Sequence, residues 1–193
     1  MAESVKTVSN LCQRTIANAD EMAYFCTVNA LDKGKKLKRE KRKQIMVRKN
    51  FMLSPHFSYE EMTRSDWAER HGVDNTPDEL QLAGLINLAW KMEPLREVFG
   101  PIRVNSAFRS PAVNEGVHGV GNSKHLSGEA MDIHIPSLAV GKEYFMFIKK
   151  NIDFDQLLFE YNRSGAIWIH CSICLDPKEN RHQAIMNYQS DRR

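Results

Sequence analysis

The sequence lacks several features that would assign it to a well-defined class of protein. No apolar run approaches the ~20 residues that span a membrane. Residues 1–30 contain no basic region followed by an apolar segment, so the sequence predicts no secretory signal. With only four cysteines in 193 residues, the chain does not suit a disulfide-stapled domain. We therefore expect a soluble protein that is made in the cytoplasm, or one that leaves the cell by a route the sequence does not show.

Two of the few cysteines have the spacing of a metal or redox pair. Cys171 and Cys174 form a C-x-x-C, but no second C-x-x-C follows, and no helix-opening redox context surrounds it. The expected state is two half-buried thiols at the end of a strand.

An excess of positive charge is confined to the first fifty residues. Residues 1–50 carry 12 Lys/Arg against 5 Asp/Glu, whereas residues 51–193 carry 15 against 19. Residues 33–49 hold ten cations and one anion, which is typical of a solvated arm, although binding to nucleic acid or an anionic envelope surface stays open. We predict a basic, flexible extension over residues 1–50 and a globular domain over residues 51–193. Met46 and Met52 leave the true start codon open, and nucleic acid is not an expected partner of the domain.

Capping signals and periodicity predict the elements of the domain. Ser58 followed by Glu61 predicts a helix that runs to His71. Thr76 as N-cap, with Pro77 next, predicts a second helix that ends near Phe99-Gly100. Its expected buried stripe comprises Leu82, Leu85, Ile86, Ala89, Trp90 and Met92.

The later part of the domain has mainly strand patterns. Strands are predicted over residues 102–108 and 129–135, and a hairpin over residues 155–161 and 166–173 with a turn at Asn162–Gly165. A short helix or turn begins at Ser110-Pro111, and a helix covers residues 138–151. This order predicts an α+β fold, a mostly antiparallel sheet with helices packed on one face.

Three residues have the chemistry of a metal site. His125 and Asp132 lie seven positions apart, and His170 lies in a second strand-like run whose alternation directs it away from the neighbouring isoleucines. Two histidines and one carboxylate leave the fourth position of a tetrahedral zinc ion open, which is the layout of a catalytic site.

The same residues carry a family resemblance. The pattern S-x-H-x-x-G-x-A-x-D at residues 123–132, followed by W-x-H at residues 168–170, resembles the zinc D-alanyl-D-alanine carboxypeptidases and the endolysins that cut peptidoglycan stem peptides. The resemblance begins near Phe57, ends near Ser172 and includes an arginine-bearing strand at residues 102–110. It implies the hedgehog/DD-peptidase fold and one Zn²⁺ ion held by His125, Asp132 and His170.

The resemblance also implies roles for other residues. Arg109 matches an arginine that stabilises negative charge on the carbonyl oxygen, with a surface salt bridge as the alternative. Ser123 matches a serine that holds substrate, with a loop cap as the alternative. Many relatives carry the general base three residues before the last histidine, but that residue is Ile167 here. Glu160 on the neighbouring strand is the candidate base, with a structural surface carboxylate as the alternative, and His134 shares the face of Asp132.

These features predict a zinc metallopeptidase that hydrolyses an amide bond in peptidoglycan stem peptides. Both a D,D-carboxypeptidase and an L-Ala-D-Glu endopeptidase fit, and the missing signal suits a phage-type endolysin that acts at the cell wall. The alternative is a non-catalytic zinc-binding recognition module of the same fold. A nucleic-acid binder through residues 33–49 is a third hypothesis. The bond that is cut and the oligomeric state stay open.

Overall fold

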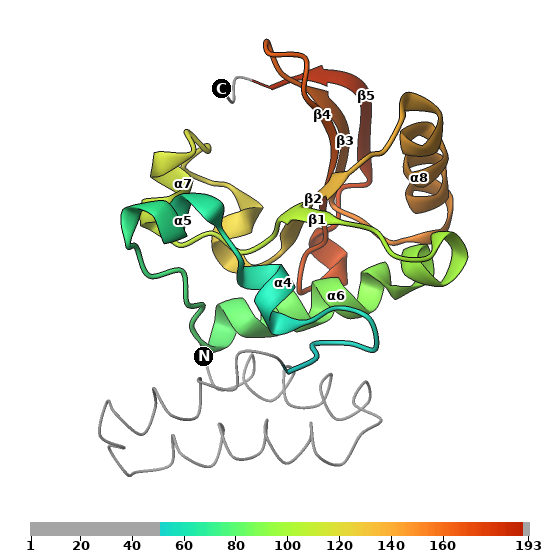
Figure 1. The fold of residues 1–193 in the computed structure, drawn as a ribbon. Helices are drawn as coiled ribbons and strands as arrows, with labels where there is room; N and C mark the ends of the chain where they lie inside the picture. The colour runs from blue at the N-terminus through green and yellow to red at the C-terminus, as the bar shows by residue number, and fades with distance from the viewer. Residues whose placement is uncertain (1–50, 191–193) are drawn as a thin grey trace. The chain divides into compact units, whose positions relative to one another are not determined.

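The computed structural model describes residues 51–190, which form a five-stranded sheet with helices around it (Figure 1). The strand order is β1-β2-β4-β3-β5, and every neighbouring pair is antiparallel except β3 and β5. In this part of the chain no helix is long and apolar enough to cross a membrane. The predicted basic extension lies outside the described residues. The elements in chain order are α4 Tyr59–Thr63, α5 Asp66–His71, α6 Glu79–Phe99, β1 Val104–Ser106, α7 Pro111–Gly116, the 3-10 helix η1 Lys124–Ser127, β2 Ala130–His134, α8 Leu138–Asn151, β3 Gln156–Tyr161, β4 Ile167–Ser172, the 3-10 helix η2 Pro177–Glu179 and β5 Gln183–Gln189.

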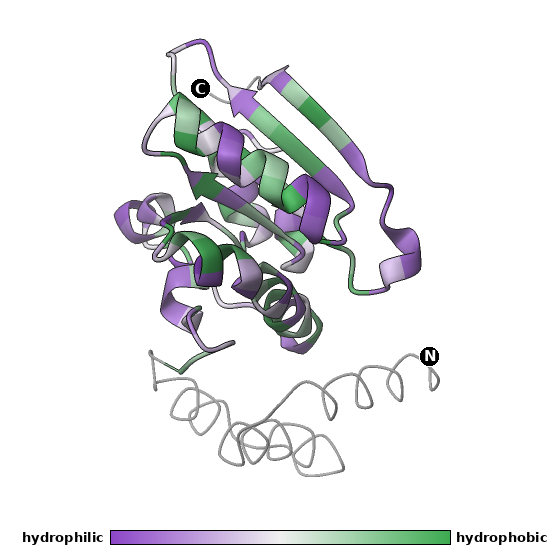
Figure 2. Cartoon of the chain, turned by 90° about the vertical axis from the view of Figure 1, so that its right-hand side faces the viewer, coloured by the Kyte–Doolittle hydropathy of each residue, from purple (hydrophilic) through white to green (hydrophobic). Residues whose placement is uncertain are grey.

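The two faces of the sheet differ in chemistry because side chains alternate along each strand. One face, called the core face, packs into the main apolar core together with residues of α6 and α8, and its fully buried members are Met131, Ile133, Leu157, Ile169 and Cys171. The opposite face, called the polar face, carries Asp132, His170 and Glu160. Figure 2, viewed from the α8 side, shows hydrophobic residues concentrated in the strands behind this helix.

The first predicted helix is two helices. Ser58 caps α4 as predicted, since its hydroxyl accepts a hydrogen bond from the Glu61 amide. However, Arg64 has an extended backbone, and Ser65 starts α5 by accepting a hydrogen bond from the amide of Ala68. A second serine cap, seven residues after Ser58 in the predicted run to His71, therefore ends one helix and begins the next.

Helix α6 begins later than predicted and ends where predicted. The N-cap is Asp78 rather than Thr76, because Asp78 and Gln81 form a reciprocal capping box. Thr76 instead donates its amide and hydroxyl hydrogens to the carboxylate of Asp74. The helix ends at Phe99 with Gly100 at a φ of 74°, a backbone angle that favours glycine. Of the predicted stripe, Leu85, Ala89 and Met92 are fully buried, while Leu82, Ile86 and Trp90 are half-buried.

The predicted strands are confirmed, with one addition. Strand β2, helix α8 and the β3–β4 hairpin match their predicted ranges to within a residue or two, while β1 is shorter than predicted. In the hairpin turn, Asn162 accepts hydrogen bonds through its side chain from Ser164 and Ala166, and Gly165 has a φ of 83°. Strand β5 was not predicted. The α+β class with a mostly antiparallel sheet is confirmed.

Candidate metal centre

His125 lies in η1, fully buried, with its two ring nitrogens in different surroundings. Its Nδ1 lies 2.5 Å from the carbonyl oxygen of Ala107, so Nδ1 carries the hydrogen and donates it. Its Nε2 has no hydrogen-bond partner among the described residues and lies 3.3 Å from Oδ1 of Asp132. Burial lowers the pKa of His125 to about 3, so the ring is neutral at physiological pH. A neutral ring with an available Nε2 lone pair is the form that binds metal ions.

Asp132 and His170 lie directly opposite each other on β2 and β4. Oδ1 of Asp132 is 2.9 Å from Nδ1 of His170, and both side chains are buried. One ligand atom from each of Asp132, His170 and His125 lies within 4.8 Å of the others. One carboxylate and two imidazoles suit a divalent ion with a fourth position open, so the predicted ligand set converges on one point.

Arg109 binds the second carboxylate oxygen of Asp132, Oδ2. Its Nη2 lies 2.5 Å from Oδ2 of Asp132, and its Nε donates to the hydroxyl of Ser106 at 2.8 Å. The backbone amide of Arg109 also donates to the carbonyl of His125. The pair of Arg109 and Asp132 is buried, so the surface salt bridge considered above is not what the structure contains. Ser106 was not predicted as a site residue, although it lies three residues before Arg109 in the arginine-bearing strand 102–110.

Glu160 lies on the polar face, one row of side chains beyond His170. In the β3–β4 ladder Leu158 lies opposite His170 and Glu160 lies opposite Trp168. Glu160 is 2% exposed, so it is not a surface carboxylate. Ile167 pairs with Tyr161 and is three residues from His170, which places it on the core side of the regular strand β4. A carboxylate at position 167 would therefore point away from the ligands, whereas one at position 160 points to their side.

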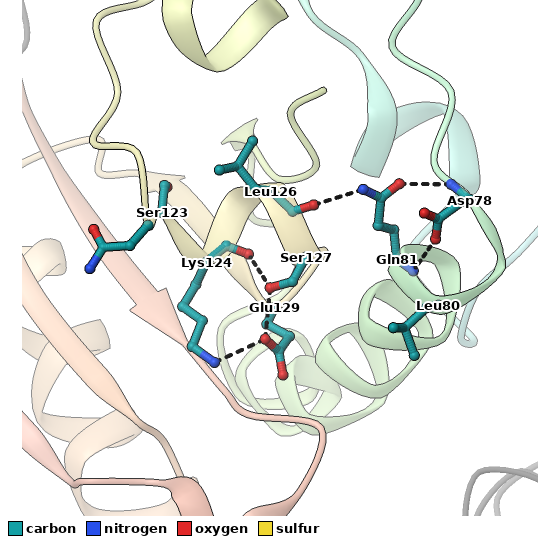
Figure 3. A pocket seen from close by; sticks show the side chains of 9 residues that line it. Asp78, Leu80, Gln81, Ser123, Lys124, Leu126, Ser127 and Glu129 are labelled. Atoms are coloured by element: carbon teal, nitrogen blue, oxygen red, sulfur yellow. Dashed lines mark hydrogen bonds and ion pairs between the residues drawn. The ribbon is translucent and has the colours of Figure 1, made fainter. Parts of the chain in front are cut away.

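Ser123 caps the 3-10 helix that carries His125. Its hydroxyl accepts a hydrogen bond from the His125 amide at 3.4 Å. Ser123 also borders an open cleft of about 490 Å³ between η1 and the start of α6 (Figure 3). The three ligand residues do not line this cleft, whose members are Asp78, Leu80, Gln81, Asn122, Ser123, Lys124, Leu126, Ser127 and Glu129. The capping role is present, and the substrate role of Ser123 stays a prediction.

Two features that hold η1 in place were not foreseen as site residues. Glu129 accepts hydrogen bonds from the Ser127 hydroxyl and the Leu175 amide, and pairs with Lys124 at 3.0 Å. Gly84 of α6 packs so closely on η1 that a Cβ atom there would lie 2.5 Å from the carbonyl oxygen of Ser127. Gly128 ends η1 with a φ of 74°, a backbone angle that favours glycine. Long-range contacts of this kind leave no local pattern in the sequence.

The C-x-x-C pair forms no metal site with the ligands. Cys171 and Cys174 are free thiols, and both are more deeply buried than predicted. Burial raises the pKa of Cys171 to about 12 and also raises the pKa of Cys174. Both thiols are therefore protonated near neutral pH.

Comparison with known proteins matches residues 55–172 to the family Peptidase M15. The chain belongs to the peptidase M15 family. The zinc D-Ala-D-Ala carboxypeptidase of Streptomyces albus G is 35% identical to it over 82 residues, which are 40% of this chain and 31% of that protein. The chain thus spans less than a third of the length of this curated relative.

The residues matched to the M15 family include every proposed site residue. The three ligand residues, Arg109 and Glu160 all lie inside it, as does Ser123. Strand β5 and the basic extension lie outside it. The family resemblance seen in the sequence is confirmed, and with it the hedgehog/DD-peptidase type of fold.

Proposed function

We propose that this protein is a zinc metallopeptidase that hydrolyses an amide bond in bacterial peptidoglycan stem peptides. The observation that carries the proposal is the convergence of three buried ligand atoms, from His125, Asp132 and His170, with a fourth position open. Membership of the M15 family and the zinc-dependent carboxypeptidase relative support the metal, the reaction and the substrate class.

The donor set fits zinc. Nε2 of His125, an oxygen of Asp132 and Nδ1 of His170 would hold the ion, and the buried Nε2 is otherwise without a hydrogen-bond partner in the described chain. Zinc held there supplies Lewis acidity toward a carbonyl oxygen and makes water acidic near neutral pH. The Ala107 carbonyl and the Arg109 guanidinium fix the orientation of His125 and Asp132.

Arg109 and Glu160 supply the remaining chemistry in the proposal. The buried Arg109 guanidinium lies beside the metal ligands, where positive charge stabilises a carbonyl oxygen as it becomes negative. Glu160 takes a proton from the attacking water through its carboxylate and passes it to the leaving amine. Its place in the row next to His170, on the face that carries the metal ligands, supports this role.

The proposal extends to the bond that is cut and to the biological role of the enzyme. Both a D,D-carboxypeptidase and an L-Ala-D-Glu endopeptidase use this chemistry, and the name of the curated relative favours the former. We further propose a phage-type endolysin role: the chain is made in the cytoplasm and acts at the cell wall after a separate protein has disrupted the membrane. The basic segment over residues 33–49 suits an anionic wall polymer.

A non-catalytic zinc-binding module is the second candidate, and Ile167 is the observation that favours it. The usual base position before the last histidine is apolar, which is what a module that had lost catalysis would show. The core-side orientation of Ile167 and the presence of Glu160 on the polar face weigh against this reading.

Digestion of purified peptidoglycan by the zinc-loaded full chain, with mass spectrometry of the products, tests the function. We expect release of stem-peptide fragments or of D-alanine, and the product identifies the bond. His170→Ala should lose both activity and zinc. Glu160→Gln should keep zinc and lose at least about 100-fold in kcat, as loss of a general base does. Glu143→Gln, an exposed carboxylate change on α8, is the matched control.

The outcomes separate the two candidates. Lysis that survives Glu160→Gln removes Glu160 from the mechanism. If the zinc-loaded wild type releases no product from several wall types, the binding module is favoured instead.

A further inference from the structure

A second row of side chains lies beside the row of metal ligands on the polar face. The first row crosses β2, β4 and β3 as Asp132, His170 and Leu158. The second row crosses the same strands as His134, Trp168 and Glu160, two residues further along each strand. Two residues along a strand advance the row by about 7 Å, the length of two residues of an extended bound peptide.

The second row lies on the leaving-group side of the scissile bond, an inference that rests on the proposed function. If Glu160 hands its proton to the leaving amine, that amine must come within hydrogen-bonding distance of the Glu160 carboxylate. The residue that carries the amine therefore lies over the row that contains Glu160, and its remaining groups face Trp168 and His134.

His134 is the accessible polar end of this row. It is exposed, whereas Trp168 and Glu160 are 8% and 2% exposed. It ends strand β2, and its backbone amide donates to the carbonyl of Arg103 at 2.9 Å, so its position is fixed by the sheet. Adjacent strands are about 4.8 Å apart, which places His134 about 10 Å from Glu160 at the backbone, with Trp168 on the strand between them.

The three strands that carry the two rows offer no cation on the polar face. None of the residues that β2, β3 and β4 present on the polar face is Lys or Arg; they are Ala130, Asp132, His134, Gln156, Leu158, Glu160, Trp168, His170 and Ser172. In the row on the far side of the metal ligands, the Gln156 amide donates to Gln183 and the Ser172 hydroxyl donates to Asp155. Within these described strands, an anion on the leaving side meets the imidazole of His134.

We infer that His134 recognises the free α-carboxylate of the substrate residue that supplies the leaving amine. In a stem peptide that ends in D-Ala-D-Ala, this carboxylate is the chain terminus. At an L-Ala-D-Glu bond, it is the α-carboxylate of D-Glu, which is free because the chain continues through the γ-carboxyl group. One specificity residue thus serves either bond, because both present the same group one residue beyond the cut.

Calorimetric titration tests the role of His134 in carboxylate recognition, without turnover of the substrate. The zinc-loaded full chain carrying Glu160→Gln is titrated with an N-acylated peptide ending in D-Ala-D-Ala and with its C-terminal amide. We expect the free acid to bind at least about tenfold more tightly, as a hydrogen bond to a charged group does. Adding His134→Ala should abolish this preference and leave the affinity for the amide unchanged, and His134→Arg should restore it. Arg103→Gln, which removes a neighbouring exposed cation, should keep the preference.

A second pair of peptides identifies the source of the carboxylate. An L-Ala-D-Glu peptide with γ-linkage is compared with its α-amide, and the pair with the larger preference is the natural substrate. Equal loss of acid and amide binding in His134→Ala, or loss of the preference in Arg103→Gln alone, overturns the inference. Absence of binding by all four peptides contradicts the proposed function itself, whereas binding without acid preference contradicts only the role of His134.

Discussion

Arg109 connects three parts of the site through one guanidinium and one amide. It contacts the Ser106 hydroxyl, the Asp132 carboxylate and, through its backbone, the turn that carries His125. A lysine would keep the charge but could not make the two fixed side-chain hydrogen bonds. We therefore predict that Arg109→Lys weakens zinc affinity about 10–100-fold, measured by competition with a chromophoric chelator. Arg103→Lys, at an exposed position, should have no effect, and equal affinities for both variants would contradict the orienting role.

Asp155 also depends on an arginine partner, Arg181, but here the pair contributes to the stability of the fold. The side-chain hydrogen bond from Arg181, which outweighs the opposing effect of burial, holds the pKa of Asp155 below its ordinary value of 3.8. A lowered pKa means that the folded chain gains stability above pH 3.8 and loses it as the pH falls below that value.

Arg181→Gln should therefore destabilise the protein by about 1–2 kcal/mol at pH 7 and by progressively less below pH 4. Urea unfolding of variant and wild type at pH 7 and pH 3 measures this difference. Arg163→Gln, in the hairpin turn, is the control. A difference that stays constant with pH would show that the contribution of Arg181 is packing rather than charge.

At the level of elements, the contact between α6 and η1 determines where His125 lies. A Cβ atom at Gly84 would meet a backbone oxygen, which cannot rotate away as a side chain can. Gly84→Ala should displace η1, lower the free energy of unfolding by about 1–3 kcal/mol and weaken zinc binding. Gly121→Ala, where the added methyl group meets open space, is the matched control for urea unfolding and zinc titration. Unchanged zinc affinity in Gly84→Ala would show that η1 can shift without moving the ligand.

Elements with local signals were predicted and elements defined by distant contacts were not. The hairpin and β2 carry alternation and turn residues, so their ranges and the shared face of Asp132 and His170 follow from the sequence. The helix starts were predicted less well, because Ser58 and Ser65 each cap a helix of their own and the capping box of Asp78 with Gln81 starts α6 two residues after Thr76. Strand β5 pairs in parallel with β3 across the sheet edge, which no short-range pattern encodes.

The convergence of the three predicted metal ligands is confirmed, whereas the contacts that hold them in place were not predicted. The ligands carry a recognisable motif, whereas the Ala107 carbonyl that orients His125 is a backbone group whose place depends on the fold. The same holds for Glu129, whose partner Leu175 is 46 residues away in sequence.

At the level of the whole molecule, the described core and the site belong to one part of the chain. The described residues 51–190 belong to one compact unit, which contains every proposed site residue. We predict that the fragment 51–193 keeps one zinc per chain and the kcat of the full chain on a soluble peptide. Its activity on intact wall should fall in a salt-dependent manner if residues 33–49 bind anionic polymer. Replacing the cations of this segment by serine in the full chain is the control, and loss of zinc from the fragment would contradict the predicted boundary.

Strand β4 keeps an imidazole and a thiol apart although they are consecutive residues. The imidazole of His170 lies with the other two metal ligands on the polar face. The thiol of Cys171 lies in the core, where burial raises the pKa of Cys171 to about 12. A thiol that stays protonated and inaccessible cannot compete for the ion or capture softer metals such as cadmium. Of the cysteines in the described part of the chain, Cys171 and Cys174 therefore need no protective reductant, and thiol reagents should modify neither of them in the folded chain.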